Sequence, residues 1–388
     1  MNSPIMPTYG RQEIAFVKGE GSWLIDSKGD RYLDALSGIA VMVLGHSNPA
    51  ITRAITEQSR ELIHTSNLYR IPNQEKLAGQ LQAISGMDNM FFANSGAEAN
   101  ECAIKIARLH GHKKKIENPV IIVADSAFHG RTLATLTATG NRKVHAGFEP
   151  LVDGFVRVPF NDIEAIKNVA ENNKSVVAIF VEPIQGEGGI RIPNIHYLKE
   201  LRNICDQKDW LLMLDEIQTG YGRTGTFFSY QNYDVTPDIA TLAKGLGNGV
   251  PIGVCLAKGK ASELMQPGNH GSTFGGNPLV CHVASAVLDE IERQKLPERA
   301  SQLGLRMKKT FEDRIGSLNI VREIRGIGLM FGIELNEPCS HLIGKALEKK
   351  LLINVTAGNV IRLLPPLTIT DAEADQICEL VSQLIEGR

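Results

Sequence analysis

The chain has 388 residues, of which 43% are hydrophobic and 22% are charged, and this ordinary globular composition excludes disordered, collagen-like and membrane-bundle proteins. The 41 Lys and Arg residues nearly balance the 43 Asp and Glu residues, so the net charge of -2 predicts neither nucleic acid nor an anionic membrane as a partner. A chain of this length is too long for one small core, so we expect one large domain and one smaller domain.

The N-terminal segment and the cysteines predict a cytoplasmic protein. The chain reaches Arg11 and Glu13 before any apolar stretch forms, which is not the pattern of a secretory signal or a membrane anchor. The six cysteines form no CxxC pair and have apolar neighbours, as expected for buried thiols in a reducing compartment.

Short β-branched or aliphatic runs alternate with longer helical patterns through the middle of the chain. This alternation is typical of a largely parallel sheet covered by helices. The predicted strands are 90–92, 120–123, 176–181, 210–214, 239–242 and 252–256. A helix is predicted to begin with Asn161 as its cap, because Glu164 three residues later can close a capping box.

The two ends of the chain predict a separate α+β unit. Residues 21–33 resemble a β-hairpin, and a single hairpin is too small to be stable alone, so we expect it to pack with the C-terminal part. That part is predicted to contain a charged helix over 289–308, strand pattern in 323–335 and 360–364, and a last helix from Asp371. We therefore predict a large domain over residues 50–285 and a small domain from residues 1–49 and 286–388.

The most informative stretch, residues 211–253, places an acid and a lysine at the ends of neighbouring strands. The first strand ends at Asp215, and the strand 239–242 ends two residues before Lys244, which lies among glycines. Open α/β sheets bind ligands at the carboxyl ends of their strands. A lysine can hold the aldehyde of pyridoxal phosphate covalently, and a carboxylate can keep its ring nitrogen protonated. Either residue alone would more often be a surface charge, so the prediction depends on the pair.

Residues 220–225 also match the GxGxxG pattern, with Asp238 near the spacing of a ribose-binding carboxylate, and this predicts an NAD-dependent dehydrogenase. Two features weaken that interpretation. The carboxylates of Asp215 and Glu216 would repel a pyrophosphate, and residues 226–234 do not resemble the helix that a dinucleotide requires. A non-enzymatic binding module is a third alternative, which the presence of both the acid and the lysine disfavours.

The block LDEIQTGYGRTG, followed by TLAKGLGNGVPIG, is similar to class III aminotransferases of the fold type I pyridoxal-phosphate family, and the resemblance covers nearly the whole chain. It implies that Lys244 carries the cofactor covalently, that Asp215 pairs with its pyridine nitrogen and that Gln218 contacts its ring hydroxyl. The intervening Glu216 and Ile217 are expected to bind the cofactor as well. The implied fold is α/β, with a mostly parallel central sheet flanked by helices in the large domain and a smaller α+β domain from both chain ends.

Two upstream segments are expected to complete the cofactor site. In FFANSGAEANE, a strand runs through a small-residue turn into a helix whose free N–H groups can bind phosphate, so Gly96 and Ala97 are candidates, although the preceding serine could simply cap an ordinary helix. In SAFHGRT, the resemblance implies that Phe128 stacks on the pyridine ring and that Arg131 binds a substrate carboxylate. Alone, these two would more often be a core residue and a surface ion pair. We expect His129 to be structural.

The resemblance also implies a second carboxylate-binding group and a contribution from a second subunit. Glu187 in VEPIQGEGG would pair with Arg362, whose flat guanidinium matches both oxygens of a carboxylate once the pair opens; a plain structural salt bridge is the alternative. In HGSTFGGNP, Thr273 would contact the cofactor phosphate of the neighbouring subunit and Ser272 would contact its substrate. These roles require at least a homodimer.

The stretch SGIAVMVLGH resembles the acetylornithine-type members. Ile39 cannot hydrogen-bond a free α-amino group, which favours an acylated donor, whereas Met42 departs from the asparagine expected there. The expected reaction moves the δ-amino group of N2-acetyl-L-ornithine to 2-oxoglutarate in arginine biosynthesis, giving N-acetylglutamate 5-semialdehyde and L-glutamate. Ornithine, succinyl-diaminopimelate and 4-aminobutyrate are alternative donors, and a mutase or decarboxylase reaction on the same fold stays open.

Overall fold

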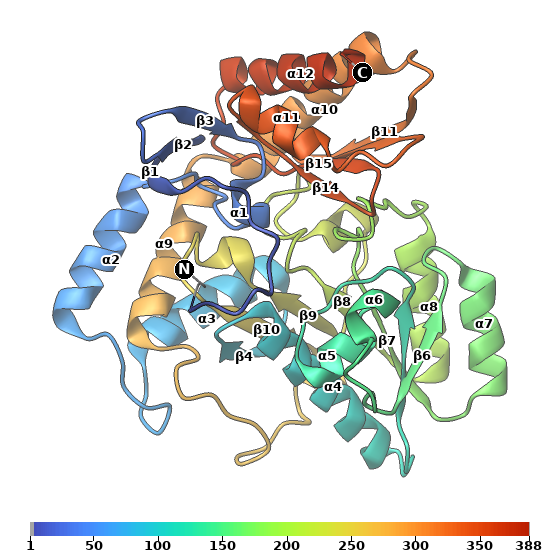
Figure 1. Cartoon of the computed structure of the whole chain (residues 1–388). Helices are drawn as coiled ribbons and strands as arrows, with labels where there is room; N and C mark the ends of the chain where they lie inside the picture. Colours follow the sequence, from blue (N-terminus) through green and yellow to red (C-terminus); the bar gives the residue numbers. More distant parts are fainter. Residues whose placement is uncertain (1–3, 388) are drawn as a thin grey trace.

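The computed structural model describes residues 4–387 as a central seven-stranded sheet with two four-stranded sheets beside it (Figure 1). The central strands are β4 (Asn89–Ala93), β5 (Val120–Ala124), β6 (Phe155–Val158), β7 (Val176–Val181), β8 (Leu211–Asp215), β9 (Ile239–Leu242) and β10 (Gly253–Ala257). Their order in the sheet is β4-β10-β9-β8-β7-β5-β6. Only β10 among these strands is reversed, because it pairs antiparallel with both β4 and β9 while the neighbours from β9 to β6 pair in parallel.

Alternate residues of the central strands pack on opposite faces of the sheet. Ile179 and Leu212 face the core under α3 (Pro72–Ser85), α8 (Tyr197–Lys208) and α9 (Pro278–Arg293). Phe180 and Met213 pack instead with the buried face of α4 (Gly96–Lys113). Strands covered on both faces must be apolar at successive positions, which explains the continuous hydrophobic runs in this part of the sequence. The remaining helices of this region are α2 (Pro49–Glu61), α5 (Leu133–Ala138), α6 (Arg142–His145) and α7 (Ile163–Asn172), with short 3-10 turns η1 (Ser229–Tyr233), η2 (Lys244–Leu246) and η3 (Gly259–Ala261).

The structure confirms the predicted sheet and its six predicted strands, and it corrects several details. It adds β6, whose short sequence FVRV is only partly buried. The helix predicted from Asn161 begins one residue later, because Asp162 caps it by accepting a hydrogen bond from the Ala165 N–H at 2.9 Å. The charged helix predicted over 289–308 is divided between α9 and α10 (Leu296–Ile315), since Lys295 adopts a left-handed φ of 50° between them.

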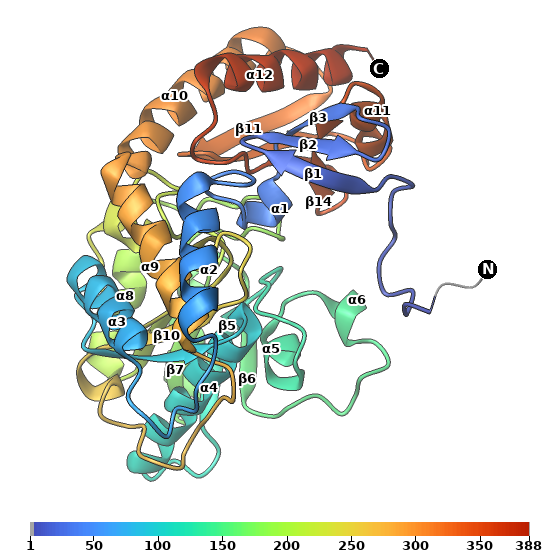
Figure 2. The same ribbon diagram turned by 90° about the vertical axis from the view of Figure 1, so that its left-hand side faces the viewer.

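The two ends of the chain lie together on one side of the molecule (Figure 2). The first small sheet contains β1 (Phe16–Glu20), β2 (Trp23–Asp26), β3 (Arg31–Asp34) and β13 (Leu351–Leu352). The second contains β11 (Val321–Ile327), β12 (Met330–Leu335), β14 (Asn354–Thr356) and β15 (Val360–Leu363), with α1 (Ser37–Ala40), α10, α11 (Leu342–Glu348) and α12 (Asp371–Glu386) nearby. The predicted hairpin is therefore present as β2 and β3, and it joins the C-terminal part through the parallel pairing of β3 with β13. The domain boundaries at residues 49/50 and 285/286 stay a prediction.

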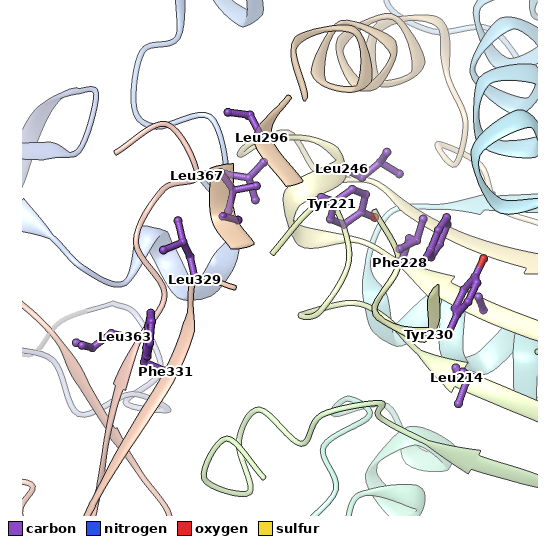
Figure 3. Close-up of a cluster of buried hydrophobic side chains, with 14 of the residues drawn as sticks. Leu214, Tyr221, Phe228, Tyr230, Leu246, Leu296, Leu329, Phe331, Leu363 and Leu367 are labelled. Atoms are coloured by element: carbon purple, nitrogen blue, oxygen red, sulfur yellow. The ribbon is translucent and has the colours of Figure 1, made fainter. Parts of the chain in front are cut away.

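Buried side chains connect these end segments to the region of the central sheet (Figure 3). On one side the cluster contains Tyr221 and Leu246, which follow β8 and β9. On the other side it contains Leu329, Phe331 and Leu363 from β12, β15 and the turn before β12. Because all of these residues are almost fully buried, the strands that carry them are held in fixed positions relative to the central sheet.

The glycine-rich segment 220–225 forms turns and not a dinucleotide-binding loop. It is followed by the short 3-10 turn η1, where a Rossmann unit would place a long helix. Asp238 is also engaged structurally, since its Oδ2 accepts hydrogen bonds from Arg202 Nη1 at 2.7 Å and from the Leu212 N–H at 2.8 Å. The structure therefore contradicts the dehydrogenase alternative.

Arg223, in this glycine-rich segment, connects the central region to the C-terminal part. Its side chain is fully buried, and Nη1 donates to the carbonyl oxygens of Leu329 at 3.0 Å and Pro365 at 2.5 Å. Burial without an acidic partner lowers the pKa of Arg223 to about 9. The side chain thus satisfies two buried carbonyl groups that belong to segments more than one hundred residues away in sequence.

We expect Arg223→Ala to destabilise the protein by about 3 kcal/mol, because it leaves a cavity and two unsatisfied carbonyl groups. The midpoint of chemical denaturation of the holoenzyme measures this loss. The matched control is Arg60→Ala, which removes an exposed arginine near the end of α2 and should change stability by less than about 0.5 kcal/mol. Equal midpoints for the two variants would contradict the role given to Arg223.

Candidate active site

The acidic residues and the lysine of the candidate site lie at the carboxyl ends of the parallel strands of the central sheet. Asp215 ends β8, Lys244 follows β9, and Glu182 follows β7. All three line one cavity of about 420 Å³. Nine of the predicted site residues line the same cavity: Gly96, Ala97, Phe128, Arg131, Glu187, Asp215, Ile217, Gln218 and Lys244. The other four predicted residues, Glu216, Ser272, Thr273 and Arg362, lie outside its wall.

Lys244 lines this cavity immediately after β9. Within residues 4–387 its ammonium group has no hydrogen-bond or ion-pair partner. Burial lowers the pKa of Lys244, and the carboxylates of Asp215 and Glu187 oppose part of that shift. Because a neutral amine is a nucleophile and an ammonium ion is not, the site favours the form of the lysine that can bond to an aldehyde.

Asp215 is held in one orientation by three donors. Its Oδ2 accepts hydrogen bonds from Asn100 Nδ2 and His129 Nδ1, each at 2.8 Å, and its Oδ1 accepts one from the Ile217 N–H at 3.1 Å. The side chain is only 4% exposed. A buried carboxylate with so many donors is oriented before any ligand arrives.

His129 belongs to this arrangement, although no sequence pattern indicates that position. Its ring is buried and stacks on Phe180, with ring centroids 4.0 Å apart. Nδ1 contacts Asp215, while the buried Nε2 has no partner in the described part of the chain. Since a carboxylate can only accept, Nδ1 carries the proton in this contact. We expected His129 to be structural only. The structure places it in the wall of the cavity, where it holds the carboxylate of Asp215.

The start of α4 offers an anion-binding site at the cavity wall. Ser95 caps the helix by accepting a hydrogen bond from the Glu98 N–H at 3.2 Å. Gly96 and Ala97 occupy the first turn, where backbone N–H groups have no acceptor within the helix. A side chain at Gly96 would place its Cβ 2.6 Å from Ile217 Cδ1, so only glycine lets these segments approach so closely. The geometry fits a phosphate group.

Gln218 presents a second unsatisfied polar atom to the cavity. Its Oε1 is buried and has no hydrogen-bond partner among the described residues. Gly186 makes room for this side chain, since a Cβ at that position would lie 2.1 Å from Gln218 Oε1. An isolated buried acceptor is costly unless a ligand donates to it. Gln218 therefore fits a hydroxyl group of a bound molecule.

The two further acids of the region, Glu216 and Glu182, point in different directions. Glu216 accepts from the Tyr230 N–H at 2.9 Å and from the Thr219 hydroxyl, which places its carboxylate away from the cavity; burial raises its pKa to about 7. Glu182 was given no role from the sequence, yet it lines the cavity. Its oxygens accept from the N–H groups of Phe128 and Gly186, and burial, assisted by the charge of Asp215, raises its pKa to about 8.

Charged side chains at the other side of the cavity fit carboxylate binding. Arg131 is exposed, and its guanidinium carbon lies 5.8 Å from the centre of the Phe128 ring. Arg362 on β15 is almost fully buried, and its Nη1 donates to Glu187 Oε1 at 2.5 Å while Nη2 donates to Asn354 Oδ1 at 2.9 Å. The structure thus brings Glu187 and Arg362 together as predicted, and their role toward a substrate stays a prediction.

Comparison with known proteins decides which family has this site. A model of the aminotransferase class-III family matches residues 6–385. The chain belongs to the class-III aminotransferases. This membership confirms the family recognised from the sequence and the fold type I architecture.

This aminotransferase is similar to curated proteins and to solved structures over nearly its whole length. It is 57% identical to the acetylornithine aminotransferase of Nitrosomonas europaea over 99% of this chain and 98% of the relative. It is 48% identical to acetylornithine aminotransferase 1 of Bordetella parapertussis over 100% of this chain and 98% of the relative. Among solved structures, it matches the ornithine aminotransferase of Toxoplasma gondii with a TM-score of 0.95 at 32% identity, covering 99% and 93% of the two chains. It matches the acetylornithine aminotransferase of Elizabethkingia anophelis with a TM-score of 0.88 at 34% identity, covering 99% and 96%.

Pyridoxal phosphate is the cofactor of class-III aminotransferases, and the cavity of this member fits it. Four groups face this cavity: the amine of Lys244, the oriented carboxylate of Asp215, the buried Oε1 of Gln218, and the first turn of α4 at Gly96 and Ala97. No group of three or more His, Cys, Asp or Glu side chains among residues 4–387 could hold a metal ion. No helix in the described residues has the length and apolar character needed to cross a membrane.

Two sequence-based expectations concern residues that do not line the cavity of this aminotransferase chain. Ser272 Oγ accepts from Asn94 Nδ2 at 3.1 Å and from the Gly275 N–H at 2.9 Å, and Thr273 is exposed. Neither residue lines the cavity of its own chain, and their role toward a second subunit stays a prediction. Ile39 is half-buried against the cluster that includes Ile184, while Val41 supplies the cavity wall.

Proposed function

We propose that this aminotransferase moves the δ-amino group of N2-acetyl-L-ornithine to 2-oxoglutarate, giving N-acetylglutamate 5-semialdehyde and L-glutamate in arginine biosynthesis. The observation that carries the proposal is the 57% identity to an acetylornithine aminotransferase along essentially the whole of both chains. The identity to the ornithine aminotransferase of Toxoplasma gondii is lower, at 32%.

The cofactor-side roles follow from the groups that face the cavity. Pyridoxal phosphate, when bound, supplies an electron-accepting ring that stabilises negative charge on the carbon bearing the substrate amine. In this proposal Lys244 holds the cofactor covalently and, once released by the incoming amine, moves the proton from that carbon. Asp215 keeps the ring nitrogen protonated. Gly96 and Ala97 bind the phosphate, and Gln218 contacts the ring hydroxyl.

The remaining cofactor contacts are proposed for Phe128, Glu216, Ile217 and Thr273. Phe128 would stack on one face of the ring, and Ile217 would pack beside it, since both line the cavity. Glu216 would act indirectly, because its carboxylate turns toward Thr219 and Tyr230. Thr273 would reach the cofactor phosphate of a neighbouring subunit.

The substrate-side roles belong to two arginines. Arg131, exposed at the cavity wall, would bind the α-carboxylate of the donor. Arg362 is covered by Glu187 in the present arrangement, which suits a donor whose reacting end is a cationic amine. When 2-oxoglutarate enters, Glu187 would release Arg362, whose planar guanidinium then takes the carboxylate next to the keto group.

The assembly and location are also proposed. A homodimer lets the exposed Thr273 and its neighbour Ser272 complete the site of the second subunit. The near-zero net charge and the six buried free cysteines are consistent with a cytoplasmic enzyme. We further propose the division into a large domain, 50–285, and a small domain, 1–49 with 286–388.

The test is a comparison of amino donors with 2-oxoglutarate as acceptor, following glutamate production by the purified holoenzyme. We expect kcat/KM for N2-acetyl-L-ornithine to exceed that for ornithine by at least about tenfold, since a site that leaves a charged α-amino group unpaired loses at least ~1.4 kcal/mol. It should also exceed the kcat/KM for 4-aminobutyrate, which has no α-carboxylate for Arg131, and that for succinyl-diaminopimelate. A higher kcat/KM for free ornithine would overturn the proposed donor. Absence of transamination with all four donors would overturn the proposed reaction.

A further inference from the structure

The loop of residues 186–190 lies against one row of residues in the sheet of β11, β12, β15 and β14. In that sheet Arg325 is directly opposite Gly332, which is in turn opposite Arg362. The row ends at Asn354, which is opposite Arg362 on its other side. Directly opposite residues of neighbouring strands share one face of a sheet. Two arginines therefore flank a glycine on the same face.

Gly332 leaves the space that the loop occupies. A Cβ at this position would lie 2.9 Å from the Cβ of Ile190, a fully buried residue of the loop. Ile190 adopts a left-handed φ of 50°, which is strained for a β-branched side chain. Such a conformation persists only where the surrounding contacts hold it, so the loop needs an anchor.

Arg325 provides that anchor. Its Nε donates to the carbonyl oxygens of Gly189 at 3.1 Å and Ile190 at 2.8 Å, and its Nη2 donates to that of Gly189 at 2.7 Å. The side chain is buried, and ion pairs with Glu323 at 2.6 Å and Glu334 at 2.7 Å hold its charge in place. The guanidinium thus fixes the loop backbone to the sheet.

At the other end of the row, Glu187 binds Arg362 through one nitrogen only. Nη1 of Arg362 donates to Glu187 Oε1 at 2.5 Å, and Nη2 donates to Asn354 Oδ1 at 2.9 Å. The buried Nε has no hydrogen-bond partner among residues 4–387. A carboxylate bound to two nitrogens of a guanidinium is held more strongly than one bound to a single nitrogen. Glu187 therefore leaves Arg362 open to a competing carboxylate.

We propose that Arg325 is a positioning residue for the acceptor half-reaction, because its hold on the loop keeps Glu187 from making a second contact with Arg362. This inference rests on the proposed release of Arg362 when 2-oxoglutarate enters. Without the anchor, the strained loop relaxes, and Glu187 moves with its backbone toward the free nitrogen of Arg362. The pair is then stronger, and the carboxylate of 2-oxoglutarate displaces Glu187 less readily. The donor half-reaction leaves the pair closed, so it does not depend on the anchor.

The experiment uses the Arg325→Lys holoenzyme and follows the two half-reactions separately by the absorbance of the cofactor. Lysine retains the positive charge beside Glu323 and Glu334, but it lacks the planar fork that binds two carbonyl oxygens. We expect the 2-oxoglutarate concentration for half-maximal rate to rise about tenfold, equal to about 1.4 kcal/mol, the size of one additional charged hydrogen bond in the pair. The corresponding concentration of N2-acetyl-L-ornithine and the limiting rates of both half-reactions should keep their wild-type values.

A double variant tests whether Arg325 acts through Glu187. Glu187→Gln removes the competing charge, so adding Arg325→Lys to it should no longer raise the half-maximal concentration of 2-oxoglutarate. Thr356→Val is a milder way to loosen the loop, because the Thr356 hydroxyl donates to the carbonyl oxygen of Glu187. It should raise the same concentration by less than Arg325→Lys does, and it replaces that variant if Arg325→Lys does not fold.

The matched control is Arg322→Lys, the same substitution on β11 at an exposed residue that pairs with Glu334 at 3.2 Å. Both of its half-reactions should equal those of the wild type. The inference is overturned if Arg325→Lys leaves the half-maximal concentration of 2-oxoglutarate unchanged, if it raises those of donor and acceptor equally, or if the rise persists in the Glu187→Gln background. A wild type that uses another amine with 2-oxoglutarate refutes only the proposed donor, and the same comparison is then made with that amine.

Discussion

Replacing Lys244 with alanine should reduce turnover by about four orders of magnitude, because it removes both the covalent anchor of the cofactor and the group that moves the proton. Lys244 is half-buried, and its amine has no hydrogen-bond or ion-pair partner in the described chain that the substitution would break. The fold should therefore survive the substitution. Steady-state glutamate production measures the loss, and circular dichroism with the thermal unfolding midpoint checks the fold.

The Lys244→Arg variant tests whether activity requires only a positive charge at this position or an amine that can bond to an aldehyde. It retains a cation at the same position but cannot bond to an aldehyde, so its activity should stay as low as that of the alanine variant. In the wild type, borohydride reduction of the holoenzyme should add the mass of the cofactor to the peptide that contains Lys244. A Lys244→Ala enzyme with near-normal turnover, or a reduced peptide that contains another lysine, would show that the site has been assigned to the wrong residue.

Asp215→Asn should lower kcat by about a thousandfold, the effect of removing one preorganised charge from a water-excluded site. The amide can still meet Asn100 and His129 sterically, so the packing around β8 should be retained. It cannot keep a ring nitrogen protonated, because a neutral amide supplies no negative charge. The absorbance maximum of the bound cofactor should shift with the loss of activity, since both report the protonation of the ring.

Two further variants test whether the lower kcat of Asp215→Asn arises in the active site or from a general loss of stability. His129→Gln removes the contact from Nδ1 to Asp215 at 2.8 Å and should lower kcat about tenfold, the loss of one charged hydrogen bond of roughly 1.5 kcal/mol. It should also shift the cofactor absorbance in the direction of the Asp215→Asn spectrum. Asp238→Asn alters a carboxylate at the opposite edge of the same sheet, so it should lower the unfolding midpoint while kcat is retained. A kcat for Asp215→Asn no lower than that for Asp238→Asn would contradict the assignment.

Much of the fold could be predicted from hydrophobic pattern alone. Runs such as Val176–Val181 are apolar at every position because both faces of the strand are covered, and this signal is local. The direction of β10 carries no such signal, since side-chain alternation is the same in a parallel and an antiparallel strand. The helix cap was missed by one residue because Asn161 and Asp162 are both good caps, and only the left-handed φ of 66° at Asn161 selects the second.

Part of the candidate site could also be predicted. Asp215 and Lys244 lie at ends of adjacent parallel strands, a position that sequence pattern can locate. His129 and Glu182 could not be assigned in the same way. His129 contacts Asp215, which lies 86 residues away in the sequence. Glu182 accepts a hydrogen bond from the N–H of Phe128, which lies 54 residues away. No local sequence pattern indicates either contact. The one available signal is their position, since each residue follows the end of a predicted buried strand.

The chemical type of this protein can be predicted without its structure: an acid and a lysine follow neighbouring strands, glycines leave room for a flat cofactor, and apolar strands hold these residues. Local residue preferences and strand spacing are sufficient for that, because both act over a few residues. Folding determines which of the charged groups are paired with one another and which can still bind a ligand. It turned Glu216 away from the cavity, joined Arg362 to Glu187, and left Arg131 without an ion-pair partner among residues 4–387. The net charge that a ligand meets depends on such pairings between distant segments, so it exists only in the folded chain.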